Sequence, residues 1–461
     1  MDEKDEMTLH EKIEELISQR NFKELTQILK DAYPIDIAEA FEGLDEKKIN
    51  ITYRLLPKTT AAEVFVDMEP DMQQLLISGF SDSELKDIID ELYVDDAVDI
   101  IEEMPATVVD RILKNANEST RKIINEILLY PEDSAGSVMT TEYIALKATM
   151  TVDQAFEHIR TVGLDSETIY TCYITNNRKL IGSITIRTLL TCDRKANIQD
   201  IMNDNVITVN TYDDREFVAE QIKKYDLIAI PVVDAENRLV GIITVDDAID
   251  VIEAEATEDM QIMAALTPNE KPYLKTTMFE TWKQRIPWLL LLMVSATFTG
   301  MIISSFESAL AVYVVLTAFI PMIMDTGGNS GSQASVTVIR ALALGEVEPG
   351  DILKVIWKEF RVGIICGSTL AVANFVKIVL VEMLLFKSIP MSKDGLIVAL
   401  VVCITLAITV MVAKLVGCSL PLLAKKLKLD PAVMASPFIT TAVDAISLIL
   451  YFQIAKALLP L

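Results

Sequence analysis

The strongest constraint on the fold is a series of long apolar stretches in the C-terminal part of the chain. A helix of about 20 apolar residues crosses a hydrocarbon core about 30 Å thick. Five stretches are long enough, so we predict a membrane domain over residues 285–461 with five transmembrane helices and the termini on opposite sides. The predicted spans are Ile286–Ser305, Ala309–Leu342, Val355–Phe386, Gly395–Leu423 and Met434–Leu459.

Charge is divided unevenly between the two parts of the chain. Residues 281–461 hold 14 Lys and Arg against 10 Asp and Glu, whereas the first 280 residues hold 27 against 57. Such an acidic N-terminal part repels phosphates and attracts cations, so we expect no nucleic-acid partner. The basic residues that flank the spans fall mainly on one side, which the positive-inside rule assigns to the cytoplasm. We therefore expect a cytoplasmic N-terminal part and an external C-terminus.

The first 252 residues contain two kinds of internal repeat. Residues 1–130 show helical periodicity, and related segments such as "DIAEAFEGL" and "TAAEVFVDM" predict an all-α superhelical N-domain. In residues 131–252, "LIGSITIRTLL" is repeated about 60 residues later as "LVGIITVDDAI". Two such α/β units resemble a tandem pair of CBS domains. Residues 253–284 are predicted to form an acidic connecting helix.

A single carboxylate, Asp444, stands at the centre of the last apolar stretch. A charge at mid-membrane costs a few kcal/mol or more unless it faces water, an ion or a partner. One explanation is an ion pathway. The alternative is a salt bridge inside the bundle, for which Lys377 and Lys414 are the available partners.

A second polar segment, "PMIMDTGGNSGSQAS", lies at membrane depth in the second span. Its proline and glycines predict a broken or loosened helix, which membranes tolerate only against protein or water. Asp325, Asn329, Ser332 and Gln333 would supply oxygen ligands there. The alternative is close helix packing through small residues. Because the span lacks histidine and paired cysteine, the oxygen chemistry favours a hard divalent cation such as Mg²⁺ or Ca²⁺, and a site with few acids fits hydrated Mg²⁺ better.

These features together resemble the MgtE family of magnesium channels. The resemblance rests on the order of domains, on "EATEDM" in the connecting helix, and on the membrane motifs "DTGGNSGSQAS" and "SPFITTAVDAISLILYF". It implies a homodimer in a bacterial-type cytoplasmic (inner) membrane, with one Mg²⁺-selective pore between the second and fifth helices of both subunits. The pore residues that it implies are Asp444, Asp325, Asn329 and Thr441.

The resemblance also implies regulation by cytoplasmic Mg²⁺, which would bridge the acidic faces of the N-domain, the CBS pair and the connecting helix and close the pore. The implied sensing residues are Asp95, Asp96, Asp226, Asp247, Asp250, Glu255, Glu258 and Asp259. ATP, bound by some relatives, would contact Arg187, Thr244 and Asp247. The second repeat carries the acid of this motif at Asp247, but the first has Thr188 in its place, which puts ATP binding in doubt.

Two other transport-related functions stay open on the sequence alone. One is a secondary transporter or exchanger of Mg²⁺, Co²⁺ or Mn²⁺ coupled to another ion, and the other is a non-conducting Mg²⁺ sensor. An enzyme is not expected, because the two histidines, His10 and His158, lie in separate regions and no phosphate-cradling motif occurs.

Overall fold

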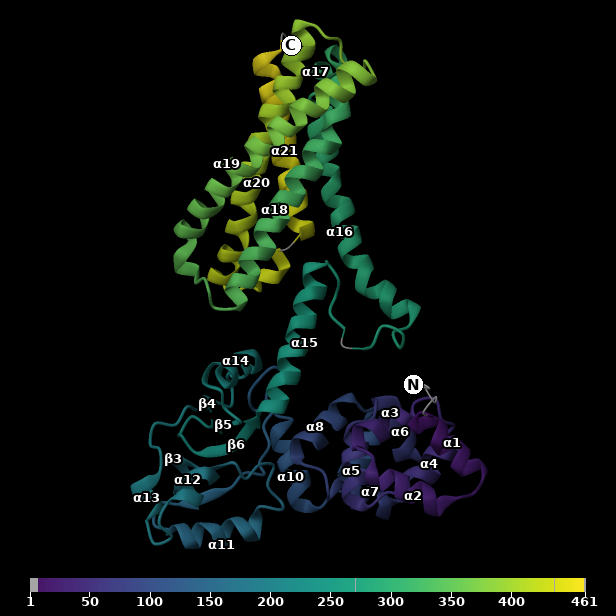
Figure 1. The fold of residues 1–461 in the computed structure, drawn as a ribbon, viewed down its shortest axis with the longest axis vertical. Helices are drawn as coiled ribbons and strands as arrows, with labels where there is room; N and C mark the ends of the chain where they lie inside the picture. The colour runs from purple at the N-terminus through teal and green to yellow at the C-terminus, as the bar shows by residue number, and fades with distance from the viewer. Residues whose placement is uncertain (1–6, 270, 435, 460–461) are drawn as a thin grey trace, which may run out of the picture. The chain divides into compact units, whose positions relative to one another are not determined.

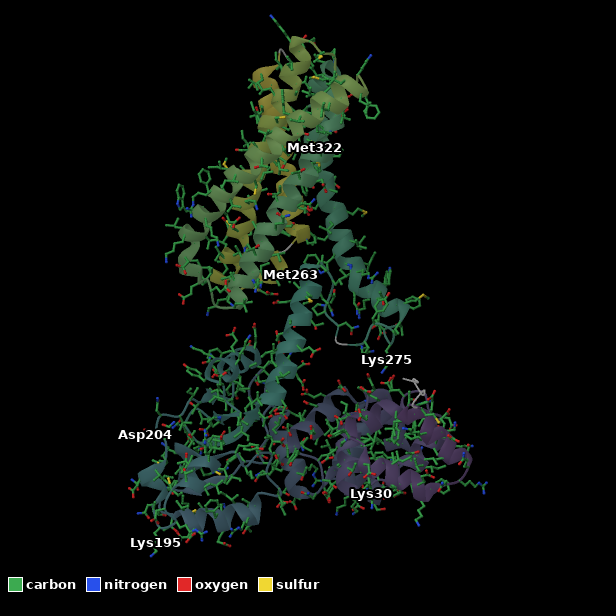
Figure 2. The ribbon with its side chains drawn as sticks, in the orientation of Figure 1. Lys30, Lys195, Asp204, Met263, Lys275 and Met322 are labelled. Carbon is green, nitrogen blue, oxygen red and sulfur yellow. The ribbon has the colours of Figure 1, made fainter. Side chains whose placement is uncertain are left out.

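The computed structural model describes residues 7–269, 271–434 and 436–459 (Figure 1). The chain forms two compact units, Met1–Ile252 and Glu253–Leu461. The first unit contains an all-α domain and an α/β domain. The second unit contains the C-terminal part of a connecting helix and a bundle of long helices. Side chains of the bundle are mostly carbon, whereas oxygen and nitrogen atoms crowd the first unit (Figure 2).

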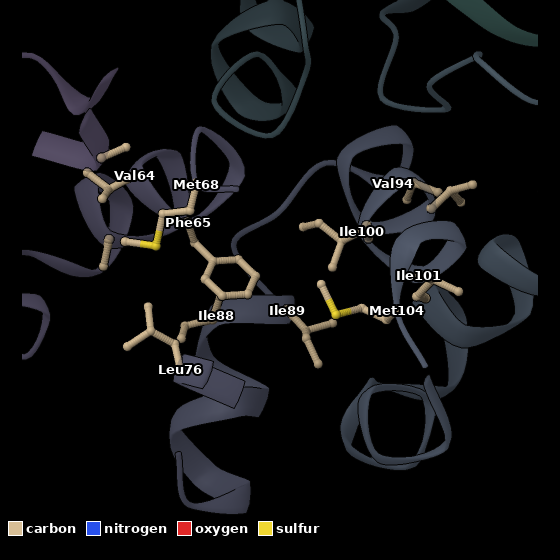
Figure 3. Close-up of a cluster of buried hydrophobic side chains, with 14 of the residues drawn as sticks. Val64, Phe65, Met68, Leu76, Ile88, Ile89, Val94, Ile100, Ile101 and Met104 are labelled. Atoms are coloured by element: carbon tan, nitrogen blue, oxygen red, sulfur yellow. The ribbon is translucent and has the colours of Figure 1, made fainter. Parts of the chain in front are cut away.

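The N-domain is a series of short helices that stabilise one another by packing. Helices of 8–10 residues are marginal alone, so they depend on end caps and on burial of one apolar face. Thr8 with Glu11, and Ser81 with Glu84, form capping boxes. Figure 3 shows Phe65 pointing into a core that also contains Ile88 and Ile100. The helices are α1 Leu9–Ser18, α2 Phe22–Asp31, α3 Pro34–Phe41, α4 Glu46–Tyr53, α5 Lys58–Val66, α6 Pro70–Gly79, α7 Asp82–Ile89, α8 Val94–Glu103, α9 Ala106–Asn115 and α10 Glu118–Ile127.

The α/β domain contains two copies of one topology, as the sequence repeat predicts. Each copy has a three-stranded sheet, in the orders β1-β2-β3 and β4-β5-β6. In each sheet the first two strands are parallel and the last two form an antiparallel hairpin. The elements are β1 Ala145–Lys147, α11 Val152–Val162, β2 Thr171–Asn176, β3 Lys179–Thr185, α12 Ile186–Thr191, α13 Ile198–Ile201, β4 Val209–Asn210, α14 Arg215–Tyr225, β5 Ala229–Val233, β6 Leu239–Thr244 and the connecting helix α15 Val245–Met263.

The part of the second unit that the structure describes contains five long helices after α15. Within the described residues, four helical segments are long and apolar enough to cross a membrane: Met278–Ser305, Pro349–Leu385, Lys393–Lys426 and Pro431–Leu458. The fifth, α18, is 24 residues long and carries the polar motif. The elements are α16 Met278–Ser305, α17 Glu307–Val312, the 3₁₀ helix η1 Val314–Phe319, α18 Ile320–Ala343, η2 Pro349–Asp351, α19 Ile352–Lys377, the π-helix η3 Ile378–Leu385, α20 Lys393–Lys426, η4 Pro431–Met434 and α21 Ser436–Leu458.

Two predictions about the second span are wrong. The stretch Ala309–Leu342 is divided into α17, η1 and α18 rather than forming one helix. In addition, the glycine-rich motif does not break α18, which is continuous from Ile320 to Ala343.

Close packing explains why the glycines do not break the helix. A β-carbon on Gly327 would lie 2.7 Å from Cγ2 of Thr409 on α20 and 3.0 Å from Oγ of Ser447 on α21. A β-carbon on Gly417 of α20 would run into the backbone of Gly331. The glycines therefore let α18 approach α20 and α21 closely, which is the alternative that the sequence left open.

Candidate cation pathway and acidic junction

The polar motif forms a stripe along one face of α18. Asp325, Asn329 and Gln333 are spaced four residues apart and are all exposed in the single chain. The opposite face, which includes Gly327, Gly331 and Ala334, is buried against the bundle. Helical periodicity thus places these three polar side chains away from the packing face. Ser332 lies at the border and is half-buried.

Asp444 on α21 is half-buried, and its carboxylate lies close enough to Asp325 of α18 for the two charges to repel each other. The structure therefore brings these two predicted pore residues together. Thr441, one turn before Asp444, is also half-buried and donates its hydroxyl to the Pro437 carbonyl at 3.0 Å. Two neighbouring carboxylates repel each other, and a cation between them would relieve that repulsion.

Each lysine that could have neutralised Asp444 is paired with another carboxylate. Nζ of Lys377 lies 3.5 Å from Glu382, and Nζ of Lys414 lies 3.9 Å from Glu359. The salt-bridge explanation of Asp444 thereby loses both of its proposed partners.

A second concentration of carboxylates lies where the N-domain meets the CBS pair, and we call it the acidic junction. Asp95 and Asp96 occupy the first turn of α8, and Asp246 and Asp247 occupy the first turn of α15. Partial positive charge at helix N-termini favours acids at these positions. The remaining members are Glu142, which repels Asp96, Glu167, which repels Asp95, and Asp99, which is repelled by Asp247 and Asp96.

Burial and mutual repulsion make the acidic junction costly to ionise. Burial, followed by repulsion from Asp247, raises the pKa of Asp95 well above its usual range and that of Asp96 to about 6. Burial and the neighbouring acids raise the pKa of Glu167 to about 7, and its buried Oε2 has no hydrogen-bond partner among the described residues. The same causes raise the pKa of Asp99, although its side chain is exposed, whereas Asp95 is buried and Asp96 is half-buried. Cations would stabilise the ionised junction.

The other predicted sensing residues are more dispersed. Repulsion from Asp250 contributes to the raised pKa of Asp247, but the Asp250 side chain is itself exposed. Asp226 is an exposed residue in the left-handed conformation at the end of α14. In the second unit, Glu255 and Glu258 flank Asp259 on α15. Burial, and then repulsion from Asp430 after α20, raise the pKa of Asp259 to about 6.

Sequence reasoning missed Asp99, Glu142, Glu167, Asp246 and Asp430. Asp99 and Asp246 stand in the same short acidic segments as predicted sensing residues, "YVDDAVD" and "TVDDAID", and this signal could have identified them. The other three join their clusters only through the fold.

The predicted nucleotide residues differ between the two repeats. In the second repeat, the Thr244 hydroxyl donates to Asp247 at 2.5 Å, so this carboxylate also closes the turn into α15. In the first repeat, the hydroxyls of Thr185 and Thr188 lie 3.0 Å apart and no acid occupies the matching position. Arg187 is exposed on α12.

Among the residues that the structure describes, no three Asp, Glu, His or Cys side chains converge closely enough to hold a metal ion. Loosely grouped carboxylates suit Mg²⁺, which dehydrates reluctantly and usually keeps several of its waters. A tight cage, as for zinc, would require converging ligands.

Comparison with known protein families finds matches in three regions of the chain. The family described as "Divalent cation transporter" matches residues 320–454, "MgtE intracellular N domain" matches residues 32–133, and "CBS domain" matches residues 135–194 and 198–254. The fold and its motifs thus define a membrane transporter of divalent cations that carries an N-domain and a CBS pair.

Two full-length relatives narrow this class. A magnesium transporter MgtE of Thermus thermophilus is 33% identical over 97% of this chain and 98% of its own. A magnesium transporter MgtE of Bacillus subtilis is 31% identical over 96% of this chain and 95% of its own. The chain belongs to the MgtE family of magnesium transporters, so it is not an enzyme and Mg²⁺ is its transported substrate.

Solved structures agree with this assignment for the first unit. The cytosolic domain of the Mg²⁺ channel MgtE, crystallised in complex with ATP, is 33% identical, with a TM-score of 0.50, and covers 52% of this chain and 98% of its own. The soluble part of a magnesium transporter is 31% identical, with a TM-score of 0.51, and covers 54% of this chain and 98% of its own.

Proposed function

We propose that the chain is a Mg²⁺-selective channel that imports Mg²⁺ across a bacterial-type cytoplasmic membrane and is closed by cytoplasmic Mg²⁺. The observation that carries the proposal is the polar stripe of α18 beside Asp444. Asp325 and Asn329 are exposed in one chain, although α18 packs within a bundle of membrane-spanning length. Polar side chains at that depth are costly against lipid and favourable against water or an ion.

A second copy of the chain would cover this stripe. Two α18 and two α21 helices around a twofold axis would enclose a path lined by both copies of Asp325 and Asp444. Hydrated Mg²⁺ would replace the missing counter-charge. The residues that line the path are Asp444, Asp325, Asn329 and Thr441, and the N-terminal domains face the cytoplasm while the C-terminus faces outward.

Regulation is the proposed role of the acidic junction and of the acids of α15. Carboxylates whose ionisation is disfavoured in the compact state repel one another when metal is absent. Mg²⁺ that binds the compact arrangement better than an open one would shift the population towards it. We assign this sensing role to Asp95, Asp96, Asp226, Asp247, Asp250, Glu255, Glu258 and Asp259, and we add Glu167.

Reconstituted flux separates the channel from the two alternatives. Purified protein in liposomes should pass Mg²⁺ without a Na⁺ or proton gradient, and added internal Mg²⁺ should reduce the initial rate. An exchanger would require the coupling gradient. A non-conducting sensor would give no flux under any condition.

The sensing residues need a separate comparison. Asp96→Asn should remain open at internal Mg²⁺ concentrations that close the wild type. Asp110→Asn is the matched control, because Asp110 is an exposed residue of the same domain outside the acidic junction. Equal inhibition of both variants would remove the acidic junction from the gating mechanism.

A further inference from the structure

An unusual element ends the third long helix of the second unit. At Lys377, the α-helix α19 passes into the π-helix η3, which runs from Ile378 to Leu385. π-Helical turns are rare and often occur at functional sites. In an α-helix, residues five apart point about 140° away from each other, whereas the wider π turn brings them onto one side. Here it allows Nζ of Lys377 to lie 3.5 Å from Oε1 of Glu382.

The pair is held from both sides. The Lys377 ammonium lies over the buried Phe319 ring, 5.6 Å from its centre. The second oxygen of Glu382 accepts a hydrogen bond from the Ser388 hydroxyl at 2.6 Å. Glu382 thus orients Lys377, and Lys377 contacts the ring by a cation–π interaction.

Phe319 is the last residue of η1 and directly precedes α18. Asp325 follows six residues later, about 9 Å along the helix axis. The same η1 segment is tied to α21, because the Tyr451 hydroxyl donates to the Leu316 carbonyl at 3.0 Å. The end of α18 that leads to Asp325 is therefore fixed both to η3 and to the helix that carries Asp444.

We propose that Lys377, oriented by Glu382, is a positioning residue that fixes the η1 end of α18 and so sets the spacing of Asp325 from Asp444. Lys377 does not bind the ion. This inference rests on the proposed channel function, since it concerns the geometry of that pathway. Loss of the contact removes neither carboxylate but lets α18 shift, which changes the spacing of Asp325 from Asp444 and weakens ion binding and selection.

The test compares Lys377→Met, Lys377→Arg, Glu382→Gln and the double variant Lys377→Met/Glu382→Gln with the wild type in Mg²⁺-flux liposomes. The readouts are the Mg²⁺ concentration at half-maximal flux, the ratio of Mg²⁺ to Ca²⁺ flux, and the thermal midpoint of the purified protein. We expect Lys377→Met to raise the half-maximal concentration about three- to tenfold and to lower the Mg²⁺ to Ca²⁺ ratio. Lys377→Arg should stay near the wild type, because Arg keeps both the ion pair and the cation–π contact.

Glu382→Gln and the double variant show whether the two residues act as one unit. The double variant should be no worse than the poorer single variant, because both changes release the same contact. If Lys377→Met does not fold, Glu382→Gln supplies the test, since it frees Lys377 without removing it.

If Lys377→Met leaves the half-maximal Mg²⁺ concentration and the Mg²⁺ to Ca²⁺ ratio unchanged, the proposal is overturned. This holds even if the variant has a lower thermal midpoint, because that change alone would show only a structural role. If Lys377→Met does not fold, an unchanged Glu382→Gln overturns it equally. Failure of the channel function itself is distinct, because the wild type would then pass no Mg²⁺.

Discussion

Removing one charge from the acidic junction should stabilise the Mg²⁺-free protein. Burial and repulsion raise the pKa of Asp96 from 3.8 to about 6. Since one pKa unit corresponds to about 1.4 kcal/mol, this shift sets an upper limit of about 3 kcal/mol on the cost of ionising Asp96 in the folded state. Solvent on its partly exposed side lowers the expected cost to about 1–3 kcal/mol. A charge at the start of α8 gains at most about 1 kcal/mol from the helix dipole, so the penalty dominates.

The sign of the pH dependence follows from proton binding. The folded state holds a proton on Asp96 up to a pH of about 6, whereas the unfolded chain loses it near 3.8. The folded state therefore binds more protons between these values, and stability falls as pH rises through that window. Asp96→Asn should remove this part of the decline and increase the free energy of unfolding above it.

The assay is urea unfolding of the first unit within the full-length protein at about pH 5 and about pH 8. Pulse proteolysis measures the unfolded fraction at each urea concentration. At the higher pH without Mg²⁺, the free energy of unfolding of Asp96→Asn should exceed that of the wild type by about 1–3 kcal/mol. Added Mg²⁺ should stabilise Asp96→Asn less than it stabilises the wild type. Asp110→Asn should change neither quantity. An Asp96→Asn protein that is less stable than the wild type at the higher pH, or that keeps the full pH dependence, would refute the reasoning.

Three further predictions concern packing, a buried ion pair and nucleotide binding. Gly417→Ala should cost about 1–3 kcal/mol in thermal unfolding, because its β-carbon would meet the Gly331 backbone, while Gly300→Ala, with open space around it, should be neutral or stabilising. Lys414→Met should destabilise by about 3–5 kcal/mol, because it leaves the buried Glu359 unpaired, and Lys414→Met/Glu359→Leu should recover most of that loss in the same assay. Thr188→Asp should tighten ATP binding in equilibrium dialysis about tenfold by supplying the acid that the first repeat lacks, and unchanged binding would contradict this role of the position.

Sequence periodicity predicted the domain order because the signals are local. The repeated segment that contains β6 specifies a strand followed by a helix without distant contacts. The apolar length of α16 and α20 likewise identifies membrane-spanning helices by itself. Asp444 was recognised for the same reason, since one charge in an apolar helix is visible without a structure.

The failures arise where packing decides the outcome. Glycines in "DTGGNSGSQAS" predict a break in α18, but the helix is continuous, and its glycines pack against α20 and α21 in contacts that a local pattern does not reveal. Glu167 reaches the acidic junction from a loop far along the chain, so only the fold shows its neighbours. The π-helix η3 has no local sequence signature, and its Lys377–Glu382 pair depends on that geometry.

The most direct test of the proposed pathway is Mg²⁺ uptake into liposomes that contain either the wild type or Asp444→Asn, with low internal Mg²⁺. Asp394→Asn is the matched control, because Asp394 is an exposed aspartate in the first turn of α20. We predict that Asp444→Asn remains folded and dimeric but loses Mg²⁺ flux, whereas Asp394→Asn keeps it. Wild-type flux through Asp444→Asn would contradict the account, because the carboxylate beside Asp325 would then not lie on the path of the ion.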